Sequence, residues 1–224
     1  MELIDVSVKL NRNLPIWPGS KGFKIEQCNS IAIGDENNVS VLTCDVHTGT
    51  HIDAPFHCLR NGKKIEDLEI TRLIGEAFVA FLPEIDVITP NDLHGLKLPK
   101  TTRKLLLKTK NSLLWANSKG HFYEDFVALT KESAVWLVEH GIDVLGIDYL
   151  SIQLYKDKGQ DTHLVLLEND VIIIEGLNLL QVEPGLYELI CLPLALENIE
   201  AAPARVILRQ FDNTNIRTFE RDSC

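Results

Sequence analysis

The sequence lacks a hydrophobic run of the ~20 residues that a membrane-spanning helix needs, because its longest run, around Val171 to Ile174, is far shorter. Its first residues contain no basic stretch followed by a long apolar one, so we expect no signal peptide. The cysteines are odd in number, scattered and without a Cys-x-x-Cys pair (Cys28, Cys44, Cys58, Cys191 and Cys224). This pattern argues against a disulfide framework and against a zinc-thiolate site. A cytoplasmic protein is expected.

Basic residues are scarce relative to acidic ones. The 22 Lys and Arg residues are outnumbered by 32 Asp and Glu residues, and the net charge of -10 disfavours binding to nucleic acids. No Gly-x-Ser-x-Gly turn occurs, so a serine hydrolase is not expected. No repeat or linker divides the 224 residues, and 45% of them are hydrophobic, which is enough for a buried core. We therefore expect a single domain over residues 1–224.

Short segments with the alternation or the apolar runs typical of β-strands follow one another along the chain. They cover Met1–Leu10, Val39–Val46, Glu76–Leu82, Arg103–Thr109, Asp143–Ile147, His163–Leu167, Val171–Ile174, Leu186–Leu192 and Ala204–Gln210. Helices are expected at Thr89–His94, where a capping Thr precedes Pro, and at Thr130–His140, which Gly141 ends. This order predicts an α/β fold that is β-rich, with a mixed, partly antiparallel sheet and few helices.

Four side chains that commonly bind metals fall between positions 47 and 57, namely His47, His51, Asp53 and His57. Thr48-Gly49-Thr50 and Pro55 argue against a helix here, and the preceding strand favours an extended chain. In an extended chain, residues 47, 49, 51 and 53 project to one face, and a glycine at 49 leaves the two imidazoles free to converge. Pro55 would then turn the chain. The spacing predicts a metal site.

The donor atoms of this cluster indicate the kind of metal. Three neutral imidazoles and one carboxylate suit Zn²⁺ or Mn²⁺, whereas Mg²⁺ and Ca²⁺ prefer mostly oxygen ligands. The alternative is that each histidine is an ordinary surface or hydrogen-bonded core residue.

A second candidate pair lies further along the chain. His163 begins one apolar segment and Glu175 ends the next, with a turn expected at Glu168–Asp170. Pairing of the two segments as an antiparallel hairpin would place His163 opposite Glu175. The pair could hold a second metal or complete the first, or it could be an exposed histidine beside a solvated glutamate.

The segment from His47 to His57, His-Thr-Gly-Thr-His-Ile-Asp-Ala-Pro-Phe-His, resembles the His-x-Gly-Thr-His-x-Asp-x-Pro-x-His signature of the cyclase-like family. The best-known enzymes of that family are bacterial kynurenine formamidases (arylformamidases). Further stretches are similar in the same order and extend the resemblance over nearly the whole chain. They are Ile16–Gly19, Glu124–Phe126, Leu145–Ser151, Ile174–Leu177, Tyr187–Leu194 and Ala202–Arg205.

The resemblance implies a swivelling β/α/β-type cyclase fold and a homodimer or homotetramer. It implies a divalent metal, Zn²⁺ first and Mn²⁺ as the alternative, with up to two ions per subunit and Asp53 bridging them. The implied ligands are His47, His51, Asp53, His163 and Glu175. His57 would be the catalytic acid and base, acting with a metal-activated water. Trp17 would be the aromatic residue of the substrate pocket, with a packed core residue as the equal alternative.

The implied activity is hydrolysis of an aryl formamide, such as N-formyl-L-kynurenine, to kynurenine and formate. The sequence departs from the formamidase pattern at Tyr149–Gln153, Asp161–Thr162 and Glu200–Ala202, which leaves the small-molecule substrate open. One alternative is an isatin- or lactone-type cyclic amide or ester hydrolase of the same family. The other is a metal-binding protein without turnover, which the spare imidazole of His57 argues against.

Overall fold

The computed structural model describes residues 2–211, in which ten β-strands and four α-helices are found. The strands are β1 (Leu3–Asp5), β2 (Phe23–Asn29), β3 (Val39–Cys44), β4 (His51–Asp53), β5 (Ile74–Leu82), β6 (Lys104–Thr109), β7 (Val144–Ile147), β8 (Ile172–Glu175), β9 (Gly185–Pro193) and β10 (Ala201–Gln210). The α-helices are α1 (Pro90–Gly95), α2 (Ser112–Asn117), α3 (Lys131–Glu139) and α4 (Asp161–Glu168). No helix in this part of the chain has the length and apolar character needed to cross a membrane.

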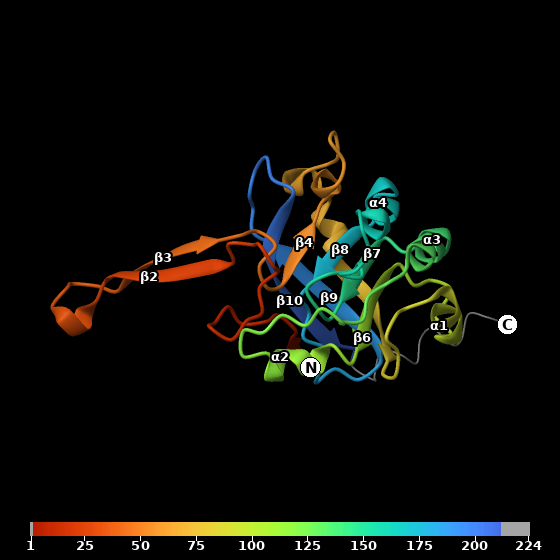
Figure 1. The fold of residues 1–224 in the computed structure, drawn as a ribbon, viewed down its shortest axis with the longest axis horizontal. Coiled ribbons are helices and arrows are strands. Elements are labelled where there is room, and N and C mark those ends of the chain that lie inside the picture. The colour runs from red at the N-terminus through yellow and green to blue at the C-terminus, as the bar shows by residue number, and fades with distance from the viewer. Residues whose placement is uncertain (1, 212–224) are drawn as a thin grey trace.

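The main sheet closes into a barrel. Its strands follow the order β1-β10-β4-β8-β7-β6-β5-β9, and an additional pairing of β9 with β10 joins the two ends so that β1 stays outside the ring. The pairings β5–β6, β6–β7 and β7–β8 are parallel, and the others are antiparallel. The predicted β-rich α/β class with a mixed sheet and few helices is therefore confirmed (Figure 1).

Two apolar cores lie on the two sides of the sheet, and successive residues of one strand enter different cores. Ile172 and Ile174 of β8 pack in one core, and Ile173 between them packs in the other. All three side chains are fully buried, which explains why this strand is a continuous apolar run and not an alternating one. The strand that ends at Glu175 is therefore held on both faces.

The prediction of a strand at His163–Leu167 and of a hairpin turn at Glu168–Asp170 was wrong. This segment belongs to α4, and its buried positions 162, 163, 166 and 167 follow helical spacing. The parallel pairing of β7 with β8 explains the difference, because two parallel strands need a crossover connection and α4 provides it. A run of apolar residues does not by itself distinguish a short buried helix from a strand.

Most other predicted elements are confirmed with small shifts at their ends. The predicted helices correspond to α1 and α3, and Ser133 N donates a hydrogen bond to the capping Thr130 Oγ1 of α3. The predicted first strand is reduced to β1, and Met1 and Cys224 lie outside the described residues. Two observed elements, β2 and α2, were not predicted from the sequence.

The strands β2 and β3 form a separate two-stranded antiparallel sheet, here called the arm (residues 23–44). Figure 1 shows the arm extending far from the barrel as a single long hairpin. Its base leads directly into the histidine-rich segment, because β3 ends at Cys44 and the first histidine is at 47.

Candidate metal centre

The short strand β4 occupies the centre of the site. It pairs with β8 on one side and with β10 on the other, and the register places His51 opposite Glu175. His51 and Asp53 are two positions apart on β4, so their side chains project to the same face of the sheet. The predicted grouping of a histidine, an aspartate and a distant glutamate therefore arises from one pair of strands.

His47 reaches the site through a turn and not through an extended strand. Residues 46 to 50 form turns and bends, and Gly49 has a φ of 72°, a left-handed conformation that favours glycine. The predicted extended stretch from 47 to 53 is therefore correct only for 51 to 53. Gly49 does leave the two imidazoles free to meet, and their ring centroids lie 5.1 Å apart.

His57 and His163 approach from two other elements. His57 ends a 3-10 turn (Pro55–His57) that begins at the proline, so Pro55 does turn the chain as expected. His163 lies in the first turns of α4, and its imidazole Nε2 is 3.3 Å from Glu175 Oε1. The predicted proximity of His163 and Glu175 is thus found, although a helix and not a hairpin produces it.

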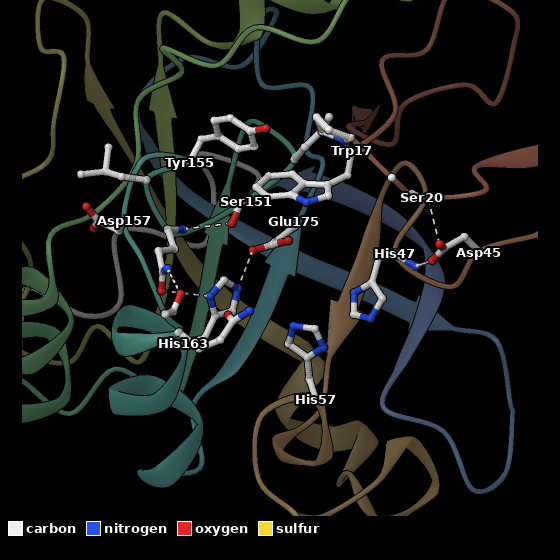
Figure 2. Close-up of a pocket in the computed structure, with 17 residues that line it drawn as sticks. Trp17, Ser20, Asp45, His47, His57, Ser151, Tyr155, Asp157, His163 and Glu175 are labelled. Atoms are coloured by element: carbon white, nitrogen blue, oxygen red, sulfur yellow. Dashed lines mark hydrogen bonds and ion pairs between the residues drawn. The ribbon is translucent and has the colours of Figure 1, made fainter.

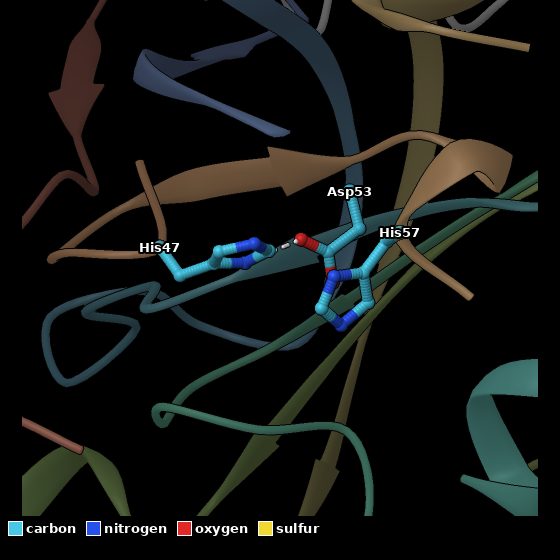
Figure 3. Close-up of side chains that lie close together, drawn as sticks. All are labelled: His47, Asp53 and His57. Atoms are coloured by element: carbon cyan, nitrogen blue, oxygen red, sulfur yellow. Dashed lines mark ion pairs between the residues drawn. The ribbon is translucent and has the colours of Figure 1, made fainter. Parts of the chain in front are cut away.

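The carboxylate of Asp53 lies at the middle of these side chains. Its Oδ1 is 3.0 Å from His47 Nδ1 and 3.6 Å from His51 Nε2, and its Oδ2 is 3.9 Å from His163 Nε2. Figure 3 shows the imidazole of His47 directed at this carboxylate, with His57 close by. His51 Nε2 also lies 3.4 Å from Glu175 Oε2.

The polar atoms at the centre of the site fit a divalent metal. Among residues 2–211, His51 Nε2 and both carboxylate oxygens of Asp53 are buried without a hydrogen-bond partner of good geometry. Leaving such atoms unpaired in the core is costly, and a cation would satisfy them. The donor atoms of His47, Asp53 and His57 lie within 4.8 Å of one another, and so do those of His51, Asp53 and Glu175. Asp53 belongs to both groups.

Electrostatics keep the two carboxyl groups charged. Burial alone would raise the pKa of Asp53, but the close contact and the charge of the His47 imidazole outweigh burial and hold this pKa below its usual range. Burial and the charge of Asp53 would likewise raise the pKa of Glu175, and the neighbouring histidines lower it. Two anionic carboxylates among imidazoles form a donor set that attracts a cation.

The histidines divide into two kinds. Burial would lower the pKa of His47, yet the close contact and the charge of Asp53 raise it to about 9. The pKa of His51 is also raised, because its contact with Glu175 and the charge of Asp53 outweigh burial. The pKa of His57 is lowered, first by burial and then by the charge of its histidine neighbours, against the opposing pull of Asp53. A neutral His57 has a ring nitrogen free to accept a proton.

Further residues, which no sequence pattern indicated, hold the predicted ligands in position. His163 Nδ1 lies 3.5 Å from Gln153 Oε1, which also accepts a hydrogen bond from Thr162 N. His51 Nδ1 lies 2.9 Å from Gly49 O. An acceptor at each Nδ1 favours the tautomer whose Nε2 lone pair faces the site, as metal-binding histidines require. These acceptors are recognised only from their positions beside the predicted ligands in the folded chain.

The loop after β7 is anchored by a buried carboxylate. Thr109 and Ser112 each donate two hydrogen bonds to Asp148, one from the backbone N–H and one from the hydroxyl. Further along this loop, Ile152 N donates a 2.7 Å hydrogen bond to Glu175 Oε1. Asp148 therefore fixes the loop that carries a backbone donor to a predicted ligand.

A cavity of about 480 Å³ opens over the histidines, and its wall includes Trp17, His57, His163 and Glu175. Figure 2 shows Trp17 and Tyr155 above the imidazoles, and the centroids of these two rings lie 5.3 Å apart. The side chain of Trp17 is 37% exposed, so the predicted pocket aromatic both packs on its neighbours and faces the cavity.

Known proteins resemble this chain over most of its length. A family model described as putative cyclase matches residues 4–153. A kynurenine formamidase from Bacillus cereus (strain ATCC 14579) is 36% identical over 208 residues, which cover 93% of this chain and 97% of the relative. Cyclase-like protein 3 from Oryza sativa subsp. japonica is 35% identical over 217 residues, covering 92% of this chain and 79% of the relative.

Solved structures have the same fold. A structure described as a predicted metal-dependent hydrolase from Bacillus stearothermophilus superposes with a TM-score of 0.79 at 33% identity, covering 92% of this chain and 97% of the other. Isatin hydrolase A from Ralstonia solanacearum superposes with a TM-score of 0.78 at 22% identity, covering 92% and 91%, and at this identity it supports the fold alone. With the site geometry, these likenesses show that the chain belongs to the cyclase family and is a metal-dependent hydrolase.

Proposed function

We propose that this hydrolase cleaves an aryl formamide, such as N-formyl-L-kynurenine, to an aromatic amine and formate. The observation that carries the proposal is the position of Asp53, which is shared by two groups of converging donor atoms at the base of an aromatic-walled cavity. The kynurenine formamidases among the relatives support the choice of substrate.

The metal that we propose is Zn²⁺, with Mn²⁺ as the alternative. Asp53 would bridge two ions, and the remaining ligands would be His47, His51, His163 and Glu175. When bound, divalent metal ions would lower the pKa of a water molecule and withdraw electrons from the substrate carbonyl. The two carboxylates would offset part of the positive charge of the ions.

The role that we propose for His57 is proton transfer. Because its pKa is lowered, its imidazole is neutral at pH 7 and can take the proton of the attacking water. The same ring nitrogen can then give this proton to the leaving nitrogen as the C–N bond breaks. The products are the neutral arylamine and formic acid, which releases its proton to solvent and becomes formate at neutral pH. The position of His57 in the cavity wall gives it access to a bound substrate.

Metal analysis of two variants tests these assignments. Asp53→Ala should lose its metal, because it removes the shared carboxylate, whereas His57→Ala should keep the metal and lose activity by about 10²- to 10⁴-fold. His121→Ala, which changes an exposed histidine of the loop after α2, should keep both metal and activity. A metal-free His57→Ala protein would make His57 a ligand, in the group that it forms with His47 and Asp53.

A substrate comparison separates this proposal from its alternatives. The metal-loaded enzyme should hydrolyse N-formyl-L-kynurenine faster than isatin, a lactone or a simple aryl ester. Preference for isatin or the lactone would assign the chain to the cyclic amide or ester hydrolases. A loaded protein that hydrolyses none of these compounds would be a metal-binding protein, and the proposed function would fail.

A homodimer is the assembly that we propose, with a homotetramer as the larger alternative. The arm exposes large apolar side chains that a second copy of the chain would cover: Ile25, Ile31, Ile33, Val39, Val41 and Leu42. Ile25 and Leu42 are direct cross-strand neighbours. The double variant Ile25→Gln, Leu42→Gln should be monomeric by light scattering, whereas Leu113→Gln, an exposed control on α2, should remain dimeric. A monomeric wild-type protein would refute this assembly.

We propose that residues 1–224 form one domain, on the ground that the closing strand β10 joins β1, β4 and β9. The cytoplasm remains the predicted location.

A further inference from the structure

We propose that Asp45 is a positioning residue that links the aromatic wall of the cavity to the metal site. Its carboxylate would hold two segments at once, the turn that carries His47 and the segment that carries Trp17. This inference rests on the proposed function, because it takes His47 as a metal ligand and the cavity above the histidines as the substrate site.

One carboxylate oxygen of Asp45 holds the turn that leads to His47. Asp45 directly follows the last residue of β3, and His47 N donates a 3.1 Å hydrogen bond to Asp45 Oδ1. Thr48 N donates a second hydrogen bond of 3.1 Å, to the backbone oxygen of Asp45. An aspartate that accepts the backbone N–H two positions later stabilises a tight turn. The direction in which His47 leaves the arm therefore depends on this side chain.

The other carboxylate oxygen holds a segment of the cavity wall. Ser20 Oγ donates a 2.8 Å hydrogen bond to Asp45 Oδ2 and accepts one of 2.9 Å from Gly22 N. Ser20 N in turn donates a 3.0 Å hydrogen bond to Trp17 O. A continuous set of hydrogen bonds therefore connects Asp45 to the residue that carries the indole ring.

The two connections meet beside the cavity. Figure 2 shows Ser20 and Asp45 next to His47, with Trp17 nearby, and all four residues line the cavity. The ring of Trp17 also packs edge-on against Tyr155, with the ring centroids 5.3 Å apart. Loss of the carboxylate would leave this ring packing in place but would free the turn and the wall segment to shift relative to each other.

The arm itself does not require a carboxylate at position 45. Asp45 N donates a 2.7 Å hydrogen bond to Gly22 O, which extends the pairing of β2 with β3 by one more backbone bond. Any residue except proline would make this bond, because it needs only the backbone N–H. Replacement of the side chain alone therefore separates the proposed positioning role from pairing within the arm.

Three variants test the inference. Asp45→Ala removes both carboxylate acceptors and should bind Zn²⁺ about 10- to 100-fold more weakly in a chelator competition, as is typical when a residue that orients a ligand is lost. At saturating Zn²⁺ it should also raise KM for the aryl formamide about 3- to 10-fold, because the wall contacts the substrate before and during the reaction. Ser20→Ala should raise KM alone. Asp45→Asn keeps Oδ1 as an acceptor, and its amide can donate to Ser20 Oγ, so it should restore most of both values.

A matched control and a measurement without turnover complete the test. Asp35, between β2 and β3 at the far end of the arm, also accepts a backbone N–H, from Ser30 at 2.6 Å. Asp35→Ala should therefore leave the Zn²⁺ affinity and KM unchanged. Hydrogen exchange of residues 17–22 should be faster in Asp45→Ala and in Ser20→Ala than in the wild type, since both lose the bond that ties this segment to the base of the arm.

The inference is overturned if Asp45→Ala keeps the Zn²⁺ affinity or the exchange rates of the wild type, or if Asp45→Asn fails to restore them. Zn²⁺ affinity and hydrogen exchange are measured without substrate. They therefore decide the role of Asp45 even if the wild type hydrolyses no aryl formamide, in which case the proposed function fails on its own.

Discussion

Replacement of Gly176 by alanine tests whether the site depends on a close approach of two backbones. Gly176 follows the proposed ligand Glu175 and has a φ of 73°. A Cβ at this position would lie 2.1 Å from Gly49 O and 2.6 Å from Gly49 C. Across the same contact, Thr50 Oγ1 donates a 2.6 Å hydrogen bond to Gly176 O. The added methyl group would therefore force the segment that precedes His51 away from the end of β8.

Comparison with a second glycine gives the expected loss of unfolding free energy. Gly141 has the same φ of 73°, but a Cβ there would meet only the end of the flexible Arg103 side chain. Both alanine variants incur the strain of the left-handed conformation, about 1–2 kcal/mol. Gly176→Ala adds a backbone clash, for which overpacking costs about 1–3 kcal/mol. We expect it to lose roughly 2–5 kcal/mol of unfolding free energy, and Gly141→Ala about 1–2 kcal/mol by the strain alone.

Urea unfolding of the metal-free proteins measures these differences, and titration of Zn²⁺ against a competing chelator measures the site. Gly176→Ala should also bind Zn²⁺ about 10- to 100-fold more weakly, since it displaces the support of a ligand. Gly141→Ala should bind Zn²⁺ like the wild type. Equal stability of the two variants, or full metal affinity of Gly176→Ala, would show that the close approach of the two backbones does not support the site.

Three other predictions concern residues around the site. Gln153→Leu should weaken Zn²⁺ binding about 10- to 100-fold in a chelator competition, because His163 loses its Nδ1 acceptor, whereas Gln153→Glu keeps an acceptor and most of the affinity. Because the pKa of His47 is raised to about 9, the metal-free protein holds a proton there at neutral pH that the metal must displace. The apparent Zn²⁺ affinity should therefore rise up to about tenfold per pH unit between about pH 7 and 9 and level off above, and a pH-independent affinity would contradict this. Asp148→Ala leaves four donated hydrogen bonds without an acceptor and should lower the urea-derived unfolding free energy by about 3 kcal/mol or more, with a loss below 1 kcal/mol as the contrary result.

The sequence predicted those helices and strands whose local residue pattern matches the backbone geometry and burial that they have in the fold. Thr130 and Gly141 mark the ends of α3 through backbone geometry, and the apolar run before Glu175 forms β8 because both faces of that strand are buried. The arm strand β2 was not predicted, since its sequence, FKIEQCN, is polar and mostly exposed. Its stability comes from pairing with β3, which no local pattern reveals.

The residues of the candidate site were predicted from the sequence, but their arrangement in space was predicted only in part. The density of histidines between 47 and 57 was enough to predict a metal site, although the turn at Gly49 was not anticipated. His163 was placed beside Glu175 by a hairpin that does not exist, and the proximity holds because α4 packs next to β8. The contribution of Gln153 depends on the tertiary fold, since ten positions separate it from the histidine that it supports.

The closure of the barrel by β10 has a consequence for the order in which the protein matures. β4, which carries His51 and Asp53, has its hydrogen-bonding edges covered by β8 and by β10, and both are synthesised long after it. During translation these two proposed ligands therefore leave the ribosome well before the strands that fix their positions. Metal capture in the native geometry would therefore require that β8 and β10 have already been synthesised and paired with β4.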